Sequence, residues 1–223
     1  MRKLFASNGL RALVHLGAWL PLALIIADYA RDALTANPIQ AILTRTGKAS
    51  LVLLVLSFAC TPLHTLLGWH AVLRVRRALG LYGFGYALLH VATFVVLDYG
   101  LDLELIAQVV VEKYYIIAGV AAFGLLLPLA LTSTRGWQRR LKQRWRVVHR
   151  LVYLAMPLAV LHFMLLVKSL LGHPEPLVWA GVVSILLALR IPIVRRRASQ
   201  LQHRLRHALR RTAALEPGSV FRS

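Results

Sequence analysis

The chain has 223 residues, of which 58% are hydrophobic, and a formal net charge of +19. Its mean hydropathy of +0.64 excludes an ordinary water-soluble domain. Positive charge alone suggests a nucleic-acid partner, but the Lys and Arg residues flank apolar runs, as membrane insertion requires, so no nucleic-acid binding is expected. The composition predicts an integral membrane protein.

Six segments are apolar enough to cross a bilayer as helices, because a membrane-spanning helix needs roughly 20 mostly apolar residues. They lie at about residues 11–29, 49–69, 79–97, 114–132, 147–167 and 177–194. The first is too long for a secretory signal and has no convincing small-residue cleavage site. We therefore expect an all-α bundle of six transmembrane helices over residues 1–194, followed by a basic tail over residues 195–223.

Positive and negative charges separate along the chain. Lys and Arg gather at the N-terminus, at residues 70–78 and 133–150, and from Arg190 onward, whereas the acidic residues other than Glu216 lie in the alternate connections. The positive-inside rule then places both termini in the cytoplasm. The basic segments are expected to bind anionic membrane lipid, and leucines at every fourth position of the tail predict a short amphipathic helix there.

The first two segments offer few groups for redox chemistry. Cys60 is the only cysteine, so a disulfide is excluded and any redox reaction requires a cofactor. His15, His64 and His70 lie near the cytoplasmic ends of these segments. Imidazoles at such a depth either reach the interface as polar tips or serve a quinone site or proton uptake.

His90 in the third segment and His162 in the fifth lie at similar depth in the membrane. The helical rise places them about 16 Å and about 22 Å from the cytoplasmic starts of their segments. Ionisable residues at membrane depth are costly to insert and mark functional sites by default. Two imidazoles on different helices can ligate a haem iron from opposite faces, so we predict that His90 and His162 do so.

Two small residues accompany this pair. Gly83 and Ala155 each precede their histidine by seven residues and so lie close to the same helix face. They either leave room for a flat macrocycle or permit close helix packing, and the sequence favours the two interpretations equally. Both residues are predicted to contribute to cofactor binding on the first interpretation.

His149 lies only about 3 Å inside the fifth segment. It either ligates a second, inner haem or is a cation at headgroup level. The matching position of the third segment holds Arg76 or Arg77, and an arginine there, for which we take Arg77, can bind a haem propionate or a flavin phosphate. The polar residues 132–135 are a further candidate for a flavin phosphate, although a polar loop needs no ligand to explain it.

Four sequence blocks follow one another with short connections: NPIQAILTRTGKASL, RRALGLYGFGYALLH, LTSTRGWQRRLKQRWRVVHRLVYL, and LHF followed by VKSLLGHPEPLVWAG. Together they resemble the MsrQ family, the haem-binding membrane subunits of bacterial periplasmic methionine sulfoxide reductase systems, which belong to the ferric reductase-like transmembrane group. The resemblance extends to about residue 195.

The resemblance implies haem b, with His90, His149 and His162 matching the three motif histidines of the family. It also implies FMN, quinol as electron donor, the inner membrane as location, and a periplasmic molybdopterin-containing partner that reduces methionine sulfoxide in proteins. The larger ferric reductases and NADPH oxidases have a second pair of haem ligands and a cytoplasmic FAD and NAD(P)H domain. Here that pair is incomplete and about 29 residues follow the sixth segment, so oxidation of NAD(P)H by this chain is not expected.

The predicted function is transfer of electrons from quinol or reduced flavin to the periplasmic reductase, without reduction of the final substrate by this chain. A proton-coupled transporter would need acidic residues at mid-membrane and an inverted repeat, neither of which is evident. In the other alternative, a structural anchor without haem, the histidines would only pack against neighbouring side chains. The outer connections, residues 30–48, 98–113 and 168–176, are expected to dock the partner.

Overall fold

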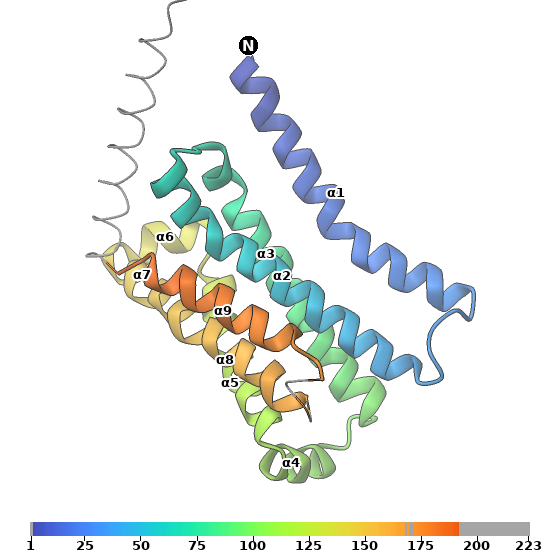
Figure 1. Cartoon of the computed structure of the whole chain (residues 1–223). Helices are drawn as coiled ribbons and strands as arrows, with labels where there is room; N and C mark the ends of the chain where they lie inside the picture. Colours follow the sequence, from blue (N-terminus) through green and yellow to red (C-terminus); the bar gives the residue numbers. More distant parts are fainter. Residues whose placement is uncertain (1, 168, 170–171, 192–223) are drawn as a thin grey trace, which may run out of the picture.

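A computed structural model describes residues 2–167, 169 and 172–191 of the chain. Within these residues the secondary structure is helical and contains no strand. The long helices run along the bundle in Figure 1, and shorter helices lie between them. They are α1 (Arg2–Ala30), α2 (Pro38–Leu67), α3 (Ala71–Ala92), α4 (Leu103–Glu112), α5 (Tyr114–Leu131), α6 (Arg135–Leu141), α7 (Gln143–Val148), α8 (Val152–Leu166) and α9 (Glu175–Ala188).

Five helical stretches of the described residues are long and apolar enough to cross a membrane: Gly9–Ala30, Pro38–Leu67, Ala71–Asp98, Tyr114–Leu131 and Gln143–Leu166. They overlap the first five predicted segments and make the chain a multi-pass membrane protein. The third includes a π-helical turn, Thr93–Asp98, after α3, and the fifth joins α7 to α8 through a 3-10 turn, His149–Leu151.

The sixth predicted segment corresponds to α9, which has 14 residues. At the helical rise this is about 21 Å, short of the roughly 30 Å of bilayer hydrocarbon. Residues 192–194 of that segment and the tail, 195–223, lie outside the described residues. The six-helix count and the cytoplasmic location of both termini therefore stay predictions.

Helix α2 begins well before the second predicted segment, because its first turn is capped. The side chain of Asn37 accepts a hydrogen bond from the Gln40 N–H at 3.1 Å, and Pro38 occupies the start of the helix, where it needs no N–H partner. The helix ends at Gly68, whose φ of 67° is left-handed. The early start brings the polar residues of the NPIQAILTRTGKAS stretch into the helix.

Connections alternate between the two ends of the bundle (Figure 1). The N-terminus of α1, the turn between α2 and α3, and α6 lie at one end, which we call the basic end; α4 and the connection between α1 and α2 lie at the other, the acidic end. This alternation agrees with the charge separation predicted from the sequence.

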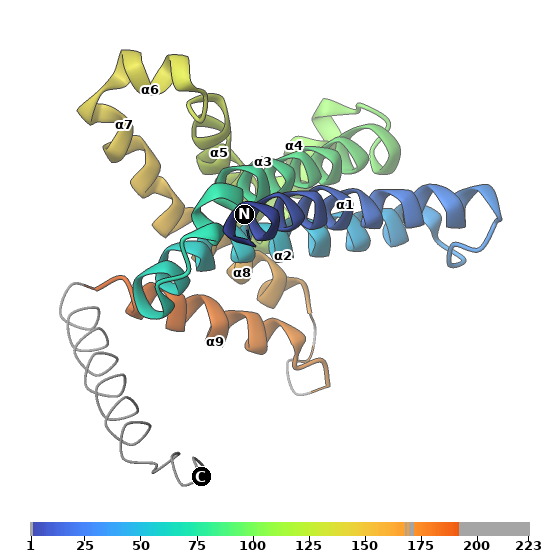
Figure 2. The ribbon, with the colours of Figure 1, turned by 90° about the horizontal axis from the view of Figure 1, so that it is seen from above.

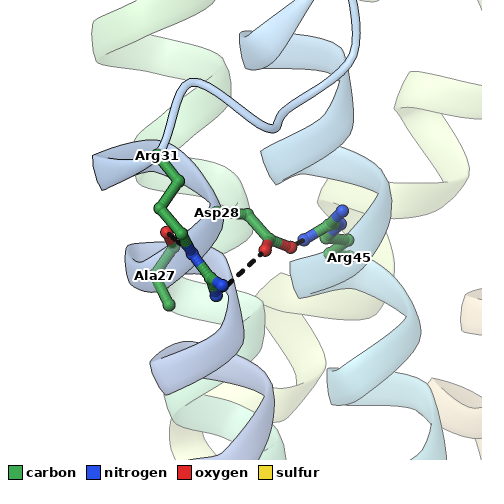
Figure 3. Close-up of polar contacts among 4 residues, drawn as sticks. All are labelled: Ala27, Asp28, Arg31 and Arg45. Carbon is green, nitrogen blue, oxygen red and sulfur yellow. Dashed lines mark hydrogen bonds and ion pairs between the residues drawn. The ribbon is translucent and has the colours of Figure 1, made fainter.

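The ion pairs among the described residues all join basic and acidic residues of the acidic end. Asp28 of α1 contacts Arg45 of α2 at 2.5 Å and Arg31 at 3.7 Å (Figure 3). Lys48 of α2 contacts Glu175 of α9 at 2.6 Å. Arg31, Arg45 and Lys48 thus neutralise carboxylates of the acidic end, and two of the pairs connect different helices.

Helix α1 packs on α2 and α3, on the far side of α2 from α9 (Figure 2). The Tyr86 hydroxyl of α3 donates to the Ala18 carbonyl at 2.6 Å and accepts from the Leu22 N–H at 3.0 Å. An uninterrupted helix would join these two groups directly, but Pro21 lies between them inside α1. Tyr86 therefore completes the backbone hydrogen bonding of α1 beside its proline.

The main core lies where α2, α5, α8 and α9 meet. Its buried members are Leu51, Leu54, Val55, Phe58, Leu126, Leu129, Ala155, Met156, Val160 and Val183. The most extensive helix packing is between α2 and α3 and between α5 and α8. The bundle thus contains two antiparallel helix pairs, and each pair carries one of the deep histidines.

Candidate functional site

The imidazole rings of His90, on α3, and His162, on α8, lie beside each other inside the bundle. Their centroids are 6.1 Å apart and their planes are inclined at 84°. Both residues are partly buried. The structure therefore brings together the two histidines that were paired on membrane depth alone.

Each ring is held by a backbone carbonyl of the neighbouring helix. His90 Nδ1 lies 2.9 Å from the Leu43 oxygen of α2, and His162 Nδ1 lies 2.7 Å from the Tyr115 oxygen of α5. A carbonyl can only accept, so each Nδ1 carries the proton and donates it. In the neutral imidazole this leaves the Nε2 lone pair available, which is the tautomer that a metal ligand needs.

The distance between the rings fits one metal ion between them. Metal–imidazole bonds are about 2 Å long, so two imidazoles on opposite sides of an ion have centroids about 6 Å apart. No group of three or more His, Cys, Asp or Glu side chains suited to a metal ion occurs among the described residues. Two neutral imidazoles without further protein ligands suit a haem iron, whose remaining ligands come from the porphyrin.

Gly83 and Ala155 pack against neighbouring helices, as one of the two interpretations of the sequence predicted, and their contribution to cofactor binding stays a prediction. A Cβ at Gly83 would lie 2.8 Å from Leu54 Cγ and 3.0 Å from the Leu54 nitrogen, so α2 fills the space beside it. The Gly83 carbonyl also accepts a hydrogen bond from the Ser50 hydroxyl at 2.8 Å. Ala155 has no exposed surface and belongs to the main core.

His149 does not join the deep pair. It lies where α7 meets α8, its ring stacks on Trp145 with centroids 4.0 Å apart, and its Nε2 is 3.2 Å from the Thr132 hydroxyl. The Arg76 guanidinium of α3 donates to the Thr61 hydroxyl at 3.0 Å. Arg76 and Arg77 are both exposed, and the role of Arg77 at this position stays a prediction.

The polar residues 132–135 make local hydrogen bonds. The Thr132 hydroxyl donates to the Pro128 carbonyl at 2.6 Å, and the Thr132 carbonyl accepts from the Trp145 indole at 3.0 Å. The Thr134 hydroxyl accepts from the Trp137 N–H and caps α6. These contacts account for Thr132 and Thr134, whereas the buried Ser133 hydroxyl oxygen has no hydrogen-bond partner among the described residues.

The other histidines of the first two segments have protein partners. His15 Nδ1 lies 2.8 Å from the Tyr82 hydroxyl, which joins α1 to α3. His64 Nε2 lies 3.0 Å from His70 Nδ1, across the turn between α2 and α3. Both pairs are exposed in the protein, and neither touches the His90–His162 pair.

Sequence reasoning missed Leu43 and Tyr115, because their contribution is a backbone carbonyl and not a side chain. One regularity in the sequence points to them only in retrospect. Each acceptor lies 47 positions before the histidine that it holds.

Comparison with known proteins shows the family of the chain. Residues 46–160 match the family model of the ferric reductase like transmembrane component. A protein-methionine-sulfoxide reductase heme-binding subunit MsrQ of Rhodospirillum rubrum is 46% identical over 191 residues, which cover 85% of this chain and 91% of the relative. The chain belongs to the MsrQ family. An MsrQ protein of Xanthomonas axonopodis pv. citri is 43% identical over 187 residues, covering 81% of this chain and 85% of the relative.

These matches confirm the resemblance predicted from the four sequence blocks. His90 and His149 of this MsrQ family member lie within the region that the family model matches, and His162 lies just after it. No solved structure matches the chain.

Proposed function

We propose that this MsrQ family member is a haem b subunit of the bacterial inner membrane. It would pass electrons from quinol or reduced flavin to a periplasmic molybdopterin-containing enzyme that reduces methionine sulfoxide in proteins. The observation that carries the proposal is the His90–His162 pair, with both Nδ1 protons engaged and both Nε2 atoms available. The names of the relatives, which join haem binding to a methionine sulfoxide reductase, support it.

The chain itself would contribute ligands, orientation and an apolar environment. When bound, haem supplies one-electron redox chemistry. His90 and His162 would ligate the iron, while the carbonyls of Leu43 and Tyr115 hold the rings against α2 and α5.

The acidic end would face the periplasmic partner. Asp28 and Glu175 are neutralised within the chain. The carboxylates that remain for an external partner are therefore Asp32, in the connection between α1 and α2, and those on and beside α4, which are Asp98, Asp102, Glu104 and Glu112. Exposed charges of this kind mainly set the rate and orientation of docking. FMN and quinol enter the proposal from the family, and no described residue is assigned to either.

Optical spectroscopy of the purified protein tests the proposal. Preparations from haem-replete cells should show sharp reduced bands of a bis-histidine haem, measured as the reduced-minus-oxidised spectrum and as haem per protein. His90→Ala and His162→Ala should each lower the haem content about tenfold or more, as is usual when a metal site is disrupted.

His173→Ala is the matched control, because His173 is exposed in the connection before α9. It should keep the haem of the unmodified protein. A colourless unmodified protein, or full haem retention in both ligand variants, would overturn the proposal and favour a transporter or a structural anchor.

A further inference from the structure

The two halves of the site repeat one local arrangement. In each half, the histidine Nδ1 contacts a carbonyl 47 positions earlier in the chain, on the helix that precedes it in the antiparallel pair. A glycine follows each of these carbonyls by one helical turn: Gly47 follows Leu43, and Gly119 follows Tyr115. The α2–α3 and α5–α8 pairs thus present their histidines in the same way.

The glycines lie directly against the imidazoles. A Cβ at Gly47 would be 3.2 Å from His90 Nδ1 and 3.4 Å from its Cε1. A Cβ at Gly119 would be 2.7 Å from His162 Nδ1 and 3.0 Å from its Cε1. Favourable contacts between heavy atoms lie at about 3.5–4.0 Å, so any larger residue at Gly119 must displace the ring, and one at Gly47 must shift it slightly.

The displacement would act on the hydrogen bond that orients the ring. In a helix, the N–H of residue i+4 already bonds to the carbonyl of residue i, so the histidine uses the second lone pair of the same oxygen. The imidazole must therefore lie close over residue i+4 to reach it. A glycine at this position leaves the required space, whereas a Cβ would press on the ring.

Other glycines of the bundle lack this constraint. Gly124 of α5, Gly85 of α3 and Gly181 of α9 would each accept a Cβ with no atom within 4 Å, apart from neighbouring residues and their own helix backbone. Gly80 and Gly83 approach the side chains Ser57 and Leu54 of α2 and not a histidine. Contact with an imidazole therefore distinguishes Gly47 and Gly119 from the other described glycines.

We infer that Gly47 and Gly119 are positioning residues for the two haem ligands. By lacking a side chain, each admits the carbonyl–imidazole hydrogen bond that sets the ring plane, the tautomer and the electron-donor strength of its histidine. The inference rests on the proposed function, because it concerns histidines that bind iron. Hydrogen bonding of the distal nitrogen raises ligand basicity and so favours ferric iron, which lowers the midpoint potential.

The test compares Gly119→Ala, Gly47→Ala and Gly124→Ala in the full chain purified from haem-replete membranes. Haem per protein and the midpoint potential, from a spectroscopic redox titration, are measured for each. Gly119→Ala should lose haem about tenfold or more, the range typical for loss of such an outer hydrogen bond. Gly47→Ala, with the milder clash, should keep more haem but show a raised midpoint potential.

Gly124→Ala should match the unmodified protein in both measurements, since its Cβ enters open space on the same helix as Gly119. The inference is overturned if the unmodified protein binds haem and both Gly47→Ala and Gly119→Ala behave like Gly124→Ala. If Gly119→Ala does not accumulate, the midpoint potential of Gly47→Ala tests the inference: a raised potential supports it, and an unchanged potential overturns it. Absence of haem from the unmodified protein would instead overturn the proposed function.

Discussion

The imidazole planes of His90 and His162 stand nearly perpendicular, at 84°. The hydrogen bonds of the two rings fix this angle, because His90 donates to a carbonyl of α2 and His162 donates to a carbonyl of α5. In a haem held by this pair, imidazole planes at this angle would leave two d orbitals of a low-spin ferric iron close in energy. The angle would therefore be visible in the magnetic properties of the oxidised protein.

We predict a highly anisotropic low-spin spectrum in electron paramagnetic resonance of the oxidised protein, dominated by one strongly shifted feature. Gly124→Ala should give the same spectrum, because it leaves both rings in place. A three-line rhombic spectrum, as nearly parallel ring planes produce, would contradict the observed angle.

His149→Ala should have a smaller effect on the haem than His162→Ala. The His149 ring lies at the basic end, stacked on Trp145, and does not contact the His90–His162 pair. Haem content per protein and the reduced band positions check the expectation. Equal losses in His149→Ala and His162→Ala would show that His149 supports the same haem. Trp145→Phe, which keeps an aromatic ring beside His149, separates an effect of the imidazole from a disturbance of the loop.

Tyr86→Phe should loosen α1 from the bundle. The change removes two hydrogen bonds to the backbone beside Pro21 and leaves the Ala18 carbonyl without its donor. Hydrogen bonds between membrane helices contribute about 0.6 kcal/mol on average and up to about 1.7 kcal/mol. We expect a loss of about 1–2 kcal/mol in unfolding free energy, measured by denaturation in detergent.

Tyr82→Phe is the matched control for that change, because Tyr82 also joins α3 to α1 but through an exposed contact with His15. Its cost should stay below about 1 kcal/mol, since water or lipid headgroups can replace an exposed partner. Equal costs for the two tyrosines would show that the backbone opening at Pro21 does not matter to stability.

Hydropathy was sufficient to predict the five long membrane-spanning helices, because apolar length is a direct requirement of the bilayer. Hydropathy did not predict the helical segments that are polar or lie outside the hydrocarbon of the bilayer. The first turns of α2 and the whole of α4 were predicted as outer connections. Asn37 with Pro38, and Asp102 with Glu104, are capping signals that could have located both starts.

The sequence predicted that the His90 and His162 side chains lie together, and their role as haem ligands stays a prediction. His90 and His162 stand out as ionisable groups in apolar helices, and depth alone was enough to pair them. Their carbonyl acceptors were not predictable, because every residue has a carbonyl. The contacts of the small residues could not be predicted either. Gly83 lies against Leu54, whereas Gly47, which the sequence does not single out, lies against His90.

The orientation of the bundle is open to a direct labelling test. In a Cys60→Ala background, His173→Cys places a single thiol at the acidic end and Arg140→Cys places one at the basic end, and both positions are exposed. The positive-inside rule predicts that a membrane-impermeant maleimide labels the thiol at 173 in intact spheroplasts. The thiol at 140 should react only after the membrane is permeabilised. The reverse pattern would place the acidic end in the cytoplasm, where its carboxylates could not dock a periplasmic partner.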